Sequence, residues 1–407
     1  AEKGGFEVHP YSNYIQSFKQ KSSDRILHVL NPQEIKALKG LNKILDEYYD
    51  SYRWFLIGLC IGQRISDLLK LKQDNIPVTV INLGIIRRKY FTPLGIFNRI
   101  SKWAKANDLL NKYIQQNGIE LVYANTTAVL LGAYLAKKNK IKHVWHVHEI
   151  IEKPKFLFLA IQWIMKRYTS TIICVSKAVQ NHWSKNAPSL LSKMQVIYNG
   201  IGPVEKSTEA SFRTQYQIPE DAIVIGMAGR VHYWKGQQYF LQIAEQLLKY
   251  STESNQTKPL YFIITGDAFP GYEYLVDEMQ DFIKKNNLED RIFYTGFEDK
   301  MDKFYSSIDL LLLPSQLPDP LPTVVLEAMQ YGIPVAATAQ GGALEMIVEN
   351  VTGISIPINN VQVAADKIFD LIQSDHRNNM RTHSIERVEK FFSASSFENQ
   401  ITTIFHL

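Results

Sequence analysis

The chain has 407 residues, of which 45% are hydrophobic and 21% charged, a composition that excludes collagen, a disulfide scaffold and a disordered chain. Its length suffices for two or three domains. The net charge of +5 conceals a basic half, with 29 Lys and Arg against 14 Asp and Glu in residues 1–205, and an acidic half, with 16 against 26 in residues 206–407.

The cysteine content and the length of the apolar runs indicate the cellular compartment in which the protein is expected. Cys60 and Cys174 are too few for a disulfide framework or a thiolate metal site, which favours a reducing environment. The charge-free runs 54–62 and 156–165 fall short of the roughly 18 residues that a membrane span needs. The chain begins at Ala1 and shows no basic and apolar leader. We therefore expect a cytoplasmic protein.

The first 76 residues carry no pattern of alternating strands. Segments 32–49 and 52–72 are predicted to be helical. The strand pattern starts abruptly near residue 78, which indicates that residues 1–76 form a separate or inserted helical segment.

From residue 78 onward, short β-branched runs alternate with helical periods. The predicted strands are 78–82, 120–124, 143–147, 171–175, 195–198, 223–228, 260–265, 291–294, 310–313 and 334–337. The predicted helices include 125–138, 236–250, 272–285, 323–331, 376–392 and 396–406.

Apolar strands separated by amphipathic helices predict an α/β fold with parallel sheets covered on both faces. The pattern breaks near residues 200–220, so we expect two Rossmann-like, doubly wound domains facing a cleft, at 77–203 and 204–380. The remaining residues, 381–407, are expected to form helices that pack back on the domains.

A glycine turn with two cations follows the predicted strand 223–228. Arg230 comes directly after Gly229, and Lys235 lies five residues further on, at the start of a predicted helix. A bidentate guanidinium, an ammonium group and a helix N-terminus together suit a diphosphate. A purely structural turn is the alternative.

A second loop, residues 315–323, precedes another predicted helix and contains Asp319. Eight residues later, Glu327 lies one or two turns inside that helix, where a carboxylate can accept hydrogen bonds from sugar or ribose hydroxyls. The alternative is a simple stabilisation of the helix dipole, worth about 0.3–1 kcal/mol for each carboxylate.

The segment from Asp319 to Glu327 places two carboxylates on either side of seven residues. This pattern resembles the signature of retaining glycosyltransferases of family 4, which have the GT-B architecture. Asp319 stands where Glu is more usual, and Pro322 stands where Gly is common. The resemblance covers residues 78–407 and also rests on further matches in the expected order: Asn199-Gly200, Gly229-Arg230 with Lys235, Thr265-Gly266-Asp267, Thr295-Gly296-Phe297, Pro314-Ser315 and Gly341-Gly342 with Glu345.

The resemblance implies roles for individual residues. Arg230 and Lys235 would neutralise the departing diphosphate, Glu327 would hold the ribose, and His148 would face the donor sugar. With Asp319, which would face the donor sugar and phosphates, the residues His148, Arg230 and Lys235 make up the implied catalytic set. Besides Glu327, the residues implied in donor binding are Gly229, Gly266, Gly296, Phe297, Leu321, Pro322 and Thr323.

The family is held to retain anomeric configuration by same-face substitution, without a protein nucleophile. The resemblance accordingly implies a nucleotide-sugar as substrate and no cofactor or essential metal. His143, His146 and His148 leave a zinc site as an alternative, although no fourth ligand is evident.

Basic residues, Lys and Arg, are interspersed with aromatic residues in segments 85–91, 100–105 and 153–168. This pattern suits a lobe that rests on an anionic membrane surface, on the inner face of the plasma membrane, and takes a saccharide or a polyprenyl-linked acceptor. Amphipathic helices whose apolar faces belong to the core are the alternative. Nucleic acid is not an expected partner.

Part of the N-terminal segment is similar to a different family. Residues 30–38 and 55–72 resemble the start of the catalytic domain of tyrosine recombinases, with Arg64 in the place of the first catalytic arginine. The family's later His-x-x-Arg box is not found. Either a recombinase fragment has replaced the first strands of a transferase, or a divergent lobe imitates the pattern.

The resemblance therefore implies a retaining glycosyltransferase of the hexosyltransferase type in surface polysaccharide synthesis, whose activity the atypical N-terminus could impair. Two alternatives stay open: a DNA-binding fusion derived from a recombinase, and a GT-B nucleotide-sugar epimerase.

Overall fold

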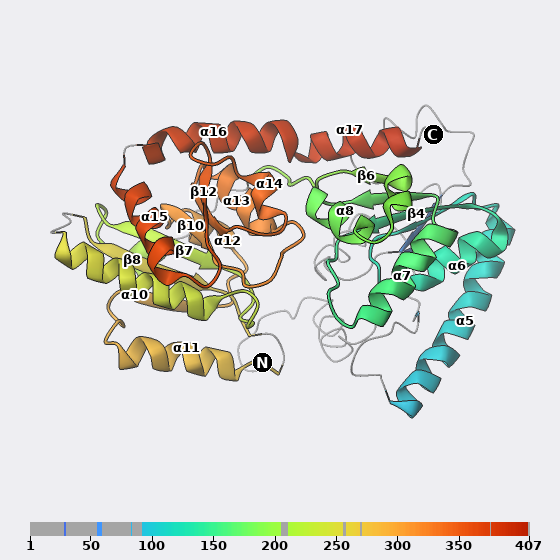
Figure 1. Ribbon diagram of the computed structural model, residues 1–407, viewed down its shortest axis with the longest axis horizontal. Helices are drawn as coiled ribbons and strands as arrows, with labels where there is room; N and C mark the ends of the chain where they lie inside the picture. The colour runs from blue at the N-terminus through green and yellow to red at the C-terminus, as the bar shows by residue number, and fades with distance from the viewer. Residues whose placement is uncertain are drawn as a thin grey trace, which may run out of the picture. The chain divides into compact units, whose positions relative to one another are not determined.

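The computed structural model describes residues 28–29, 55–58, 83, 92–204, 211–254, 258–268, 271–374 and 376–405. These residues divide into two compact units (Figure 1). The first contains the described residues up to Ile173 together with Trp183–Gln195. The second contains Cys174–His182 and the described residues from Val196 onward.

A six-stranded sheet, ordered β1-β2-β3-β4-β5-β6, forms the centre of the first unit. Its strands are β1 (His28–Val29), β2 (Phe55–Gly58), β3 (Leu121–Ala124), β4 (Lys142–Val147), β5 (Thr171–Cys174) and β6 (Met194–Val196). β2 pairs in parallel with β3, and β3 with β4, whereas β1 is antiparallel to β2.

The prediction that residues 52–72 are helical is wrong at Phe55–Gly58. This segment is strand β2, in register with β3 from Phe55 opposite Leu121 to Gly58 opposite Ala124. A short apolar run fits a buried strand as well as a helix, and its pairing partner lies more than 60 residues away in the sequence. The predicted helix 32–49, the predicted strand 78–82 and Arg64 lie outside the described residues.

The helices described between residues 93 and 193 are α5 (Pro93–Asn117), α6 (Leu130–Asn139), α7 (Lys155–Tyr168), α8 (Lys177–Ser184) and the 3₁₀ helix η2 (Pro188–Lys193). Thr92 caps α5, since its hydroxyl accepts from the Gly95 amide at 3.1 Å. The helix ends at Gly118, whose φ of 56° suits glycine. Leu110 and Leu131 belong to the buried cluster between α5, α6 and the sheet.

Helix α6 begins five residues later than predicted. Residues 125–129 form a loop after β3, because polar contacts replace the helical ones there: the Trp145 indole donates to the Thr126 carbonyl at 2.7 Å. This loop carries Asn125.

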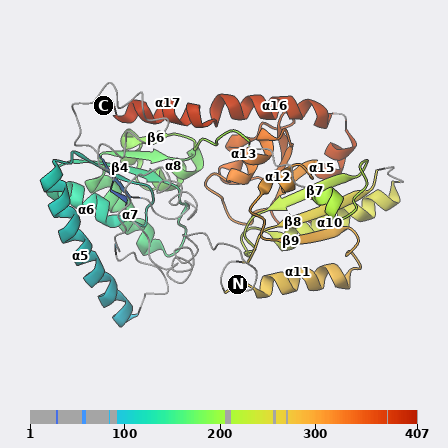
Figure 2. The same ribbon diagram turned by 180° about the vertical axis from the view of Figure 1, so that it is seen from behind.

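The second unit contains a parallel six-stranded sheet, ordered β12-β11-β10-β7-β8-β9. The strands are β7 (Ile223–Ala228), β8 (Leu260–Thr265), β9 (Ile292–Gly296), β10 (Leu310–Leu313), β11 (Val335–Thr338) and β12 (Gly353–Ile356), and β7, β8 and β9 can be followed in Figure 2. This is the Rossmann strand order, so the expected doubly wound architecture is confirmed. The edge strand β12 was not predicted.

Nine helices are described after β6: α9 (Phe212–Gln215), α10 (Gln237–Glu253), α11 (Tyr274–Lys285), α12 (Met301–Tyr305), α13 (Thr323–Gln330), α14 (Ala343–Met346), α15 (Val361–Gln373), α16 (His376–Phe391) and α17 (Ala394–Phe405). α10 packs against α15, and α13 against α16. Phe240 of α10 and Phe262 of β8 lie fully buried at the centre of the core.

No helix in the described ranges combines the length and the apolar character that crossing a bilayer requires.

A substitution at Gly353 tests how closely the edge strand β12 packs against β11. A Cβ at this position would lie 2.1 Å from the carbonyl oxygen of Val335, its partner on β11. Gly353→Ala must therefore push β12 away from β11, and we expect a loss of about 1–3 kcal/mol in the free energy of unfolding, measured in urea. Gly202→Ala is the control, because its Cβ would meet nothing within 4 Å. Equal stability of the two variants would contradict the described pairing.

His143 predicts acid sensitivity. Its ring is fully buried in β4, Nδ1 lies 3.1 Å from the Thr169 hydroxyl, and burial lowers its pKa to about 3. The unfolded chain takes up this proton near pH 6.5, so stability falls as the pH drops from about 6.5 toward 3, by at most ~1.4 kcal/mol per pH unit. His143→Gln should make the pH dependence of urea unfolding shallower between pH 7 and 5. A pH dependence in His143→Gln as steep as that of the wild type would contradict this assignment.

Candidate functional site

The strand order of the second unit reverses between β7 and β10, and ligands of open α/β sheets bind beside the carboxyl ends of the strands at such a point. Three of the predicted glycines lie at this edge. Gly229 and Gly266 directly follow β7 and β8, and Gly296 ends β9. Their backbones form hydrogen bonds across the edge: Gly229 donates to Thr265 at 2.9 Å, and Gly266 to Gly296 at 2.8 Å.

Glycine is required here because the chains run very close together. Gly266 has a φ of +133°, and a Cβ on it would lie 2.0 Å from the carbonyl oxygen of Gly229. Such a conformation and such an approach are open to glycine alone. The edge therefore presents backbone rather than side chains.

The loop after β7 contacts the loop after β10. A Cβ on Gly236 would lie 2.0 Å from the Pro314 carbonyl oxygen, and the Gln316 amide donates to the Trp234 carbonyl at 2.7 Å. These contacts bring Lys235 to Asp319, with Nζ and Oδ2 2.6 Å apart. The structure thus joins two predicted site residues that are 84 positions apart in the sequence.

The Lys235–Asp319 ion pair is largely withdrawn from solvent. The two side chains are 17% and 13% exposed, and the ammonium group also lies 4.3 Å from the centre of the Trp234 ring. Arg230 belongs to the same loop, and its carbonyl oxygen accepts from the Gln237 side chain at 3.0 Å. The loop therefore carries both predicted cations at the switch point.

Two further glycines contact the backbone of the loop that carries Asp319. The Gly342 amide donates to the Asp319 carbonyl at 2.8 Å, and Gly341 packs against the same residue so closely that a Cβ would lie 2.4 Å from its carbonyl oxygen. Leu321 and Pro322 are buried, whereas Thr323 is exposed at the first position of α13. The N-terminus of α13, with its partial positive charge, thus follows directly on this loop.

Glu327 lies one turn inside α13 and accepts a hydrogen bond that sequence reasoning missed. The hydroxyl of Tyr305, at the end of α12, donates to its Oε2 at 2.6 Å. Tyr305 is 22 residues before Glu327, and its place in the sequence carries no motif that could have revealed the contact.

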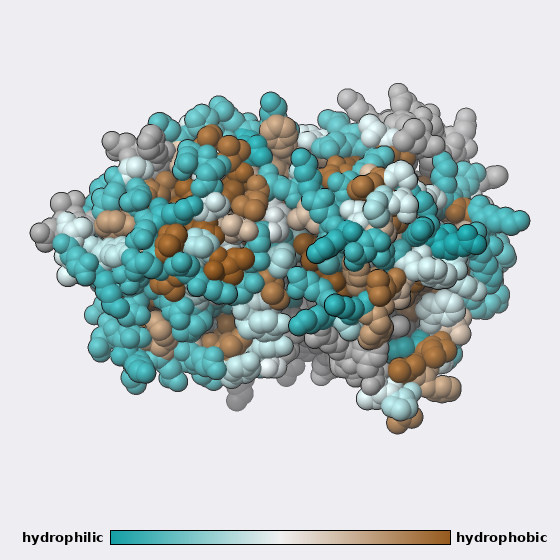
Figure 3. Space-filling model, in the orientation of Figure 1, coloured by the Kyte–Doolittle hydropathy of each residue, from teal (hydrophilic) through white to brown (hydrophobic). Residues whose placement is uncertain are grey.

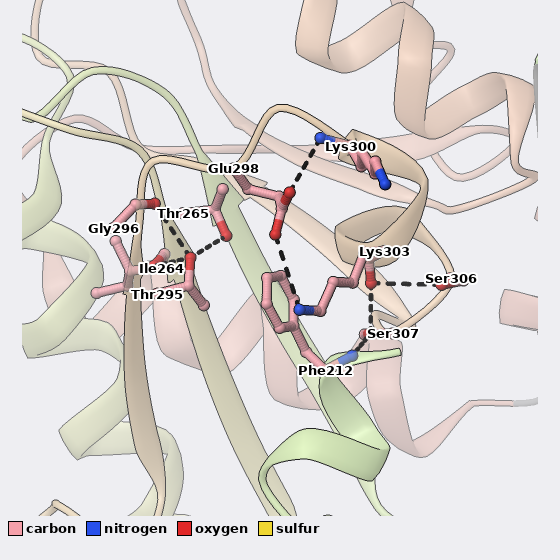
Figure 4. Close-up of polar contacts among 10 residues, drawn as sticks. All are labelled: Phe212, Ile264, Thr265, Thr295, Gly296, Glu298, Lys300, Lys303, Ser306 and Ser307. Carbon is pink, nitrogen blue, oxygen red and sulfur yellow. Dashed lines mark hydrogen bonds and ion pairs between the residues drawn. The ribbon is translucent and has the colours of Figure 1, made fainter. Parts of the chain in front are cut away.

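The loop after β9 carries Phe297, which is 73% exposed. The hydroxyls of Thr265 and Thr295 lie 2.9 Å apart, and the Glu298 carboxylate lies 3.8 Å from the Lys303 ammonium group (Figure 4). The Lys303 ammonium group also lies 4.6 Å from the centre of the Phe212 ring. The loop is therefore anchored on both sides while Phe297 projects into solvent.

His148 belongs to the first unit, directly after β4. Its Nε2 lies 2.7 Å from Oδ1 of Asn125, in the loop that precedes α6. Burial lowers the pKa of His148, and the neighbouring Glu149 opposes that shift. Glu149 in turn accepts from the Thr127 and His148 amides, at 3.1 and 3.2 Å. A neutral imidazole of fixed orientation results, suited to hydrogen bonding.

The three histidines of the zinc alternative do not share one face of β4. The rings of His146 and His148 lie 4.2 Å apart, and Nδ1 of His146 is 2.6 Å from the Tyr123 hydroxyl, whereas His143 contacts Thr169. Residues 143 and 146 are an odd number apart, so alternation places them on opposite sides. In the parts of the chain that the structure describes, no three His, Cys, Asp or Glu side chains are grouped to hold a metal ion.

Comparison with known proteins identifies both halves of the chain. Residues 208–390 match the family model of group 1 glycosyl transferases, and residues 70–204 match that of glycosyltransferase family 4. The second match begins within the segment that resembles a recombinase.

Three relatives show the extent of the likeness. An uncharacterized glycosyltransferase of Methanocaldococcus jannaschii is 29% identical over 48% of this chain, and the O-antigen biosynthesis glycosyltransferase WclY of Escherichia coli is 26% identical over 40%. These two alignments cover less than half of the relatives' own lengths, 49% and 42% respectively. The lipopolysaccharide 1,2-N-acetylglucosaminetransferase of Salmonella typhimurium is 27% identical over 80% of this chain and 82% of its own.

Solved structures extend the likeness to the fold. Anabaena Alr3699/HepE in complex with UDP has a TM-score of 0.70 and 25% identity, covering 91% of this chain and 96% of its own. A glycosyltransferase from Rickettsia africae, at 20% identity, has a TM-score of 0.71 and shares the fold. Together, the two family models cover residues 70–204 and 208–390, and the chain belongs to the glycosyltransferases.

Proposed function

We propose that this chain is a retaining glycosyltransferase that moves a hexosyl group from a nucleotide-diphosphate sugar to a saccharide or polyprenyl-linked acceptor in surface polysaccharide synthesis. The observation that carries the proposal is the close contact of Lys235 with Asp319 at the switch point of the second unit, beside a glycine-lined edge. The UDP complex of HepE and the lipopolysaccharide and O-antigen relatives support it. The comparisons support neither the recombinase-derived fusion nor the epimerase.

The chemistry follows from where charge develops. When the glycosyl bond breaks, negative charge appears on the departing phosphate, and fixed cations lower the barrier; losing one such donor typically costs about 2.7–4 kcal/mol. Lys235 suits this role because Asp319 and Trp234 hold its ammonium group in place before the substrate arrives. Arg230 would add a second cation from the same loop.

The remaining groups would orient the donor. Glu327 would accept from the ribose, and Phe297 would lie beside the base. His148, whose pKa is lowered by burial, would contact the sugar as a neutral hydrogen-bonding group rather than as an acid. We propose direct same-face substitution, with no protein nucleophile and no essential metal.

Ligand-dependent melting tests the donor site. The wild type is melted with UDP, GDP, ADP and their sugars, without metal, and we expect a selective rise in Tm for one nucleotide. A ligand at about 100 times its Kd adds about 2.7 kcal/mol of stability. Lys235→Ala and Glu327→Ala should each abolish this rise while unfolding cooperatively.

Lys249→Ala is the matched control, since that lysine forms an exposed ion pair with Glu245 on the surface of α10. It should retain the full ligand-induced rise. If both site variants bind nucleotide as the wild type does, the assignment of the donor site is wrong.

We further propose that the basic first half rests on the anionic inner face of the plasma membrane, which would make the protein cytoplasmic and peripheral. Helix α7 exposes an apolar stripe, Phe156, Leu159 and Trp163, which are 63%, 54% and 58% exposed. The exposed basic side chains of Lys155 and Lys166 flank the stripe. Figure 3 shows a second hydrophobic area at the N-terminal end of α5, where Leu94 and Phe97 are exposed. Apolar residues flanked by cations are typical of interfacial helices.

Sedimentation with vesicles tests this surface. The wild type should bind vesicles rich in phosphatidylglycerol, and binding should weaken with salt because the cations contribute through screened attraction. Phe156→Ser with Trp163→Ser should reduce the bound fraction severalfold. Tyr274→Ser, at a 51% exposed aromatic residue of α11 in the second unit, serves as the control. Equal binding of all three proteins would refute the assignment of α7.

A further inference from the structure

Tyr305 is enclosed in a way that fixes its hydroxyl. The side chain is 3% exposed, and its ring stacks on that of Tyr331, with centroids 5.2 Å apart and planes inclined by 29°. Phe304 contacts it edge-on at 5.2 Å. From this packed ring, the hydroxyl donates to Oε2 of Glu327 at 2.6 Å.

The contact orients the Glu327 carboxylate. A hydrogen bond to an ionised carboxylate is shorter and stronger than one between neutral groups. It restrains a side chain that would otherwise lose considerable rotamer freedom on binding a ligand. In the described part of the chain, the structure records a hydrogen bond at Oε2 and none at Oε1. One oxygen is thus held, and the other remains as an acceptor.

We propose that Tyr305 is a positioning residue for ribose selection: by holding Oε2 of Glu327, it directs Oε1 toward a ribose hydroxyl of a bound nucleoside diphosphate. This inference rests on the proposed function, because it takes Glu327 as the ribose-binding group. Tyr305 itself would touch no substrate. Its contribution would appear as discrimination between ribose and deoxyribose rather than as general affinity for the diphosphate.

The fold supplies a matched control beside Tyr305. The Tyr331 hydroxyl donates to Oδ1 of Asp302 at 2.5 Å, so the stacked partner also forms a tyrosine–carboxylate hydrogen bond. Burial, followed by the hydrogen bond to Asp302, raises the pKa of Tyr331, which therefore stays a neutral donor. Asp302 lies in the first turn of α12, outside the predicted donor site.

Calorimetric titrations compare UDP, GDP and ADP with their 2′-deoxy and 3′-deoxy forms, using the full chain. For the nucleotide that binds, the wild type should favour the ribose form over at least one deoxy form by about tenfold, which corresponds to 1.4 kcal/mol. Tyr305→Phe should reduce this preference to about twofold or less while leaving the affinity for that deoxy form unchanged. Tyr331→Phe should keep the full preference.

A double-mutant cycle separates positioning from general damage. Glu327→Gln should also remove the preference, and adding Tyr305→Phe to it should cause no further loss, because the two residues act as one unit. Tm values without ligand show whether each variant is folded.

A full ribose preference in Tyr305→Phe would overturn the inference. So would an equal loss in Tyr331→Phe, or additive losses in the double variant. Failure of the wild type to bind any of the three diphosphates is a different result, since it would overturn the proposed function itself.

Discussion

The candidate donor site depends on the close approach of backbones at the carboxyl edge of the second sheet. Gly266 lies against the carbonyl group of Gly229, Gly236 against that of Pro314, and Gly342 against that of Pro320. A Cβ on any of these three glycines would lie only 2.0 Å from the facing carbonyl oxygen. Side chains at these positions would separate the loops after β7, β8 and β10. Because the loops meet, a lysine from one and a carboxylate from the other can form a short ion pair in a region mostly withdrawn from water.

That ion pair resolves an electrostatic problem. A cation ready to receive a diphosphate must be held in place while the site is empty, and an unpaired buried charge is costly. Asp319 neutralises Lys235 and fixes it against the Trp234 ring. Asp319 stands where the family signature more usually has Glu, and it reaches the lysine because the Gly236–Pro314 and Gln316–Trp234 contacts bring the loops after β7 and β10 together. The departure from the signature is thus accommodated by local packing.

The sequence predicted most of the elements around this site. Strands such as Ile223–Ala228 and Leu260–Thr265 were placed with their observed bounds, because buried parallel strands are continuous apolar runs. It failed at Phe55–Gly58, where an apolar run was read as helix, and at Gly353–Ile356, where the edge strand was overlooked. Both are four-residue segments, too short for periodicity to distinguish their conformations.

By itself, the sequence determined the fold class, the order of the loops and the identity of the charged residues, since apolar periodicity and the spacing of glycines and cations are local properties of the chain. Only the tertiary structure decided which of these residues meet. It joined Lys235 to Asp319 across 84 positions, gave Glu327 a tyrosine partner and set His148 against Asn125. Such contacts depend on which strands are neighbours in the sheet, and that order arises from long-range pairing that no local pattern encodes.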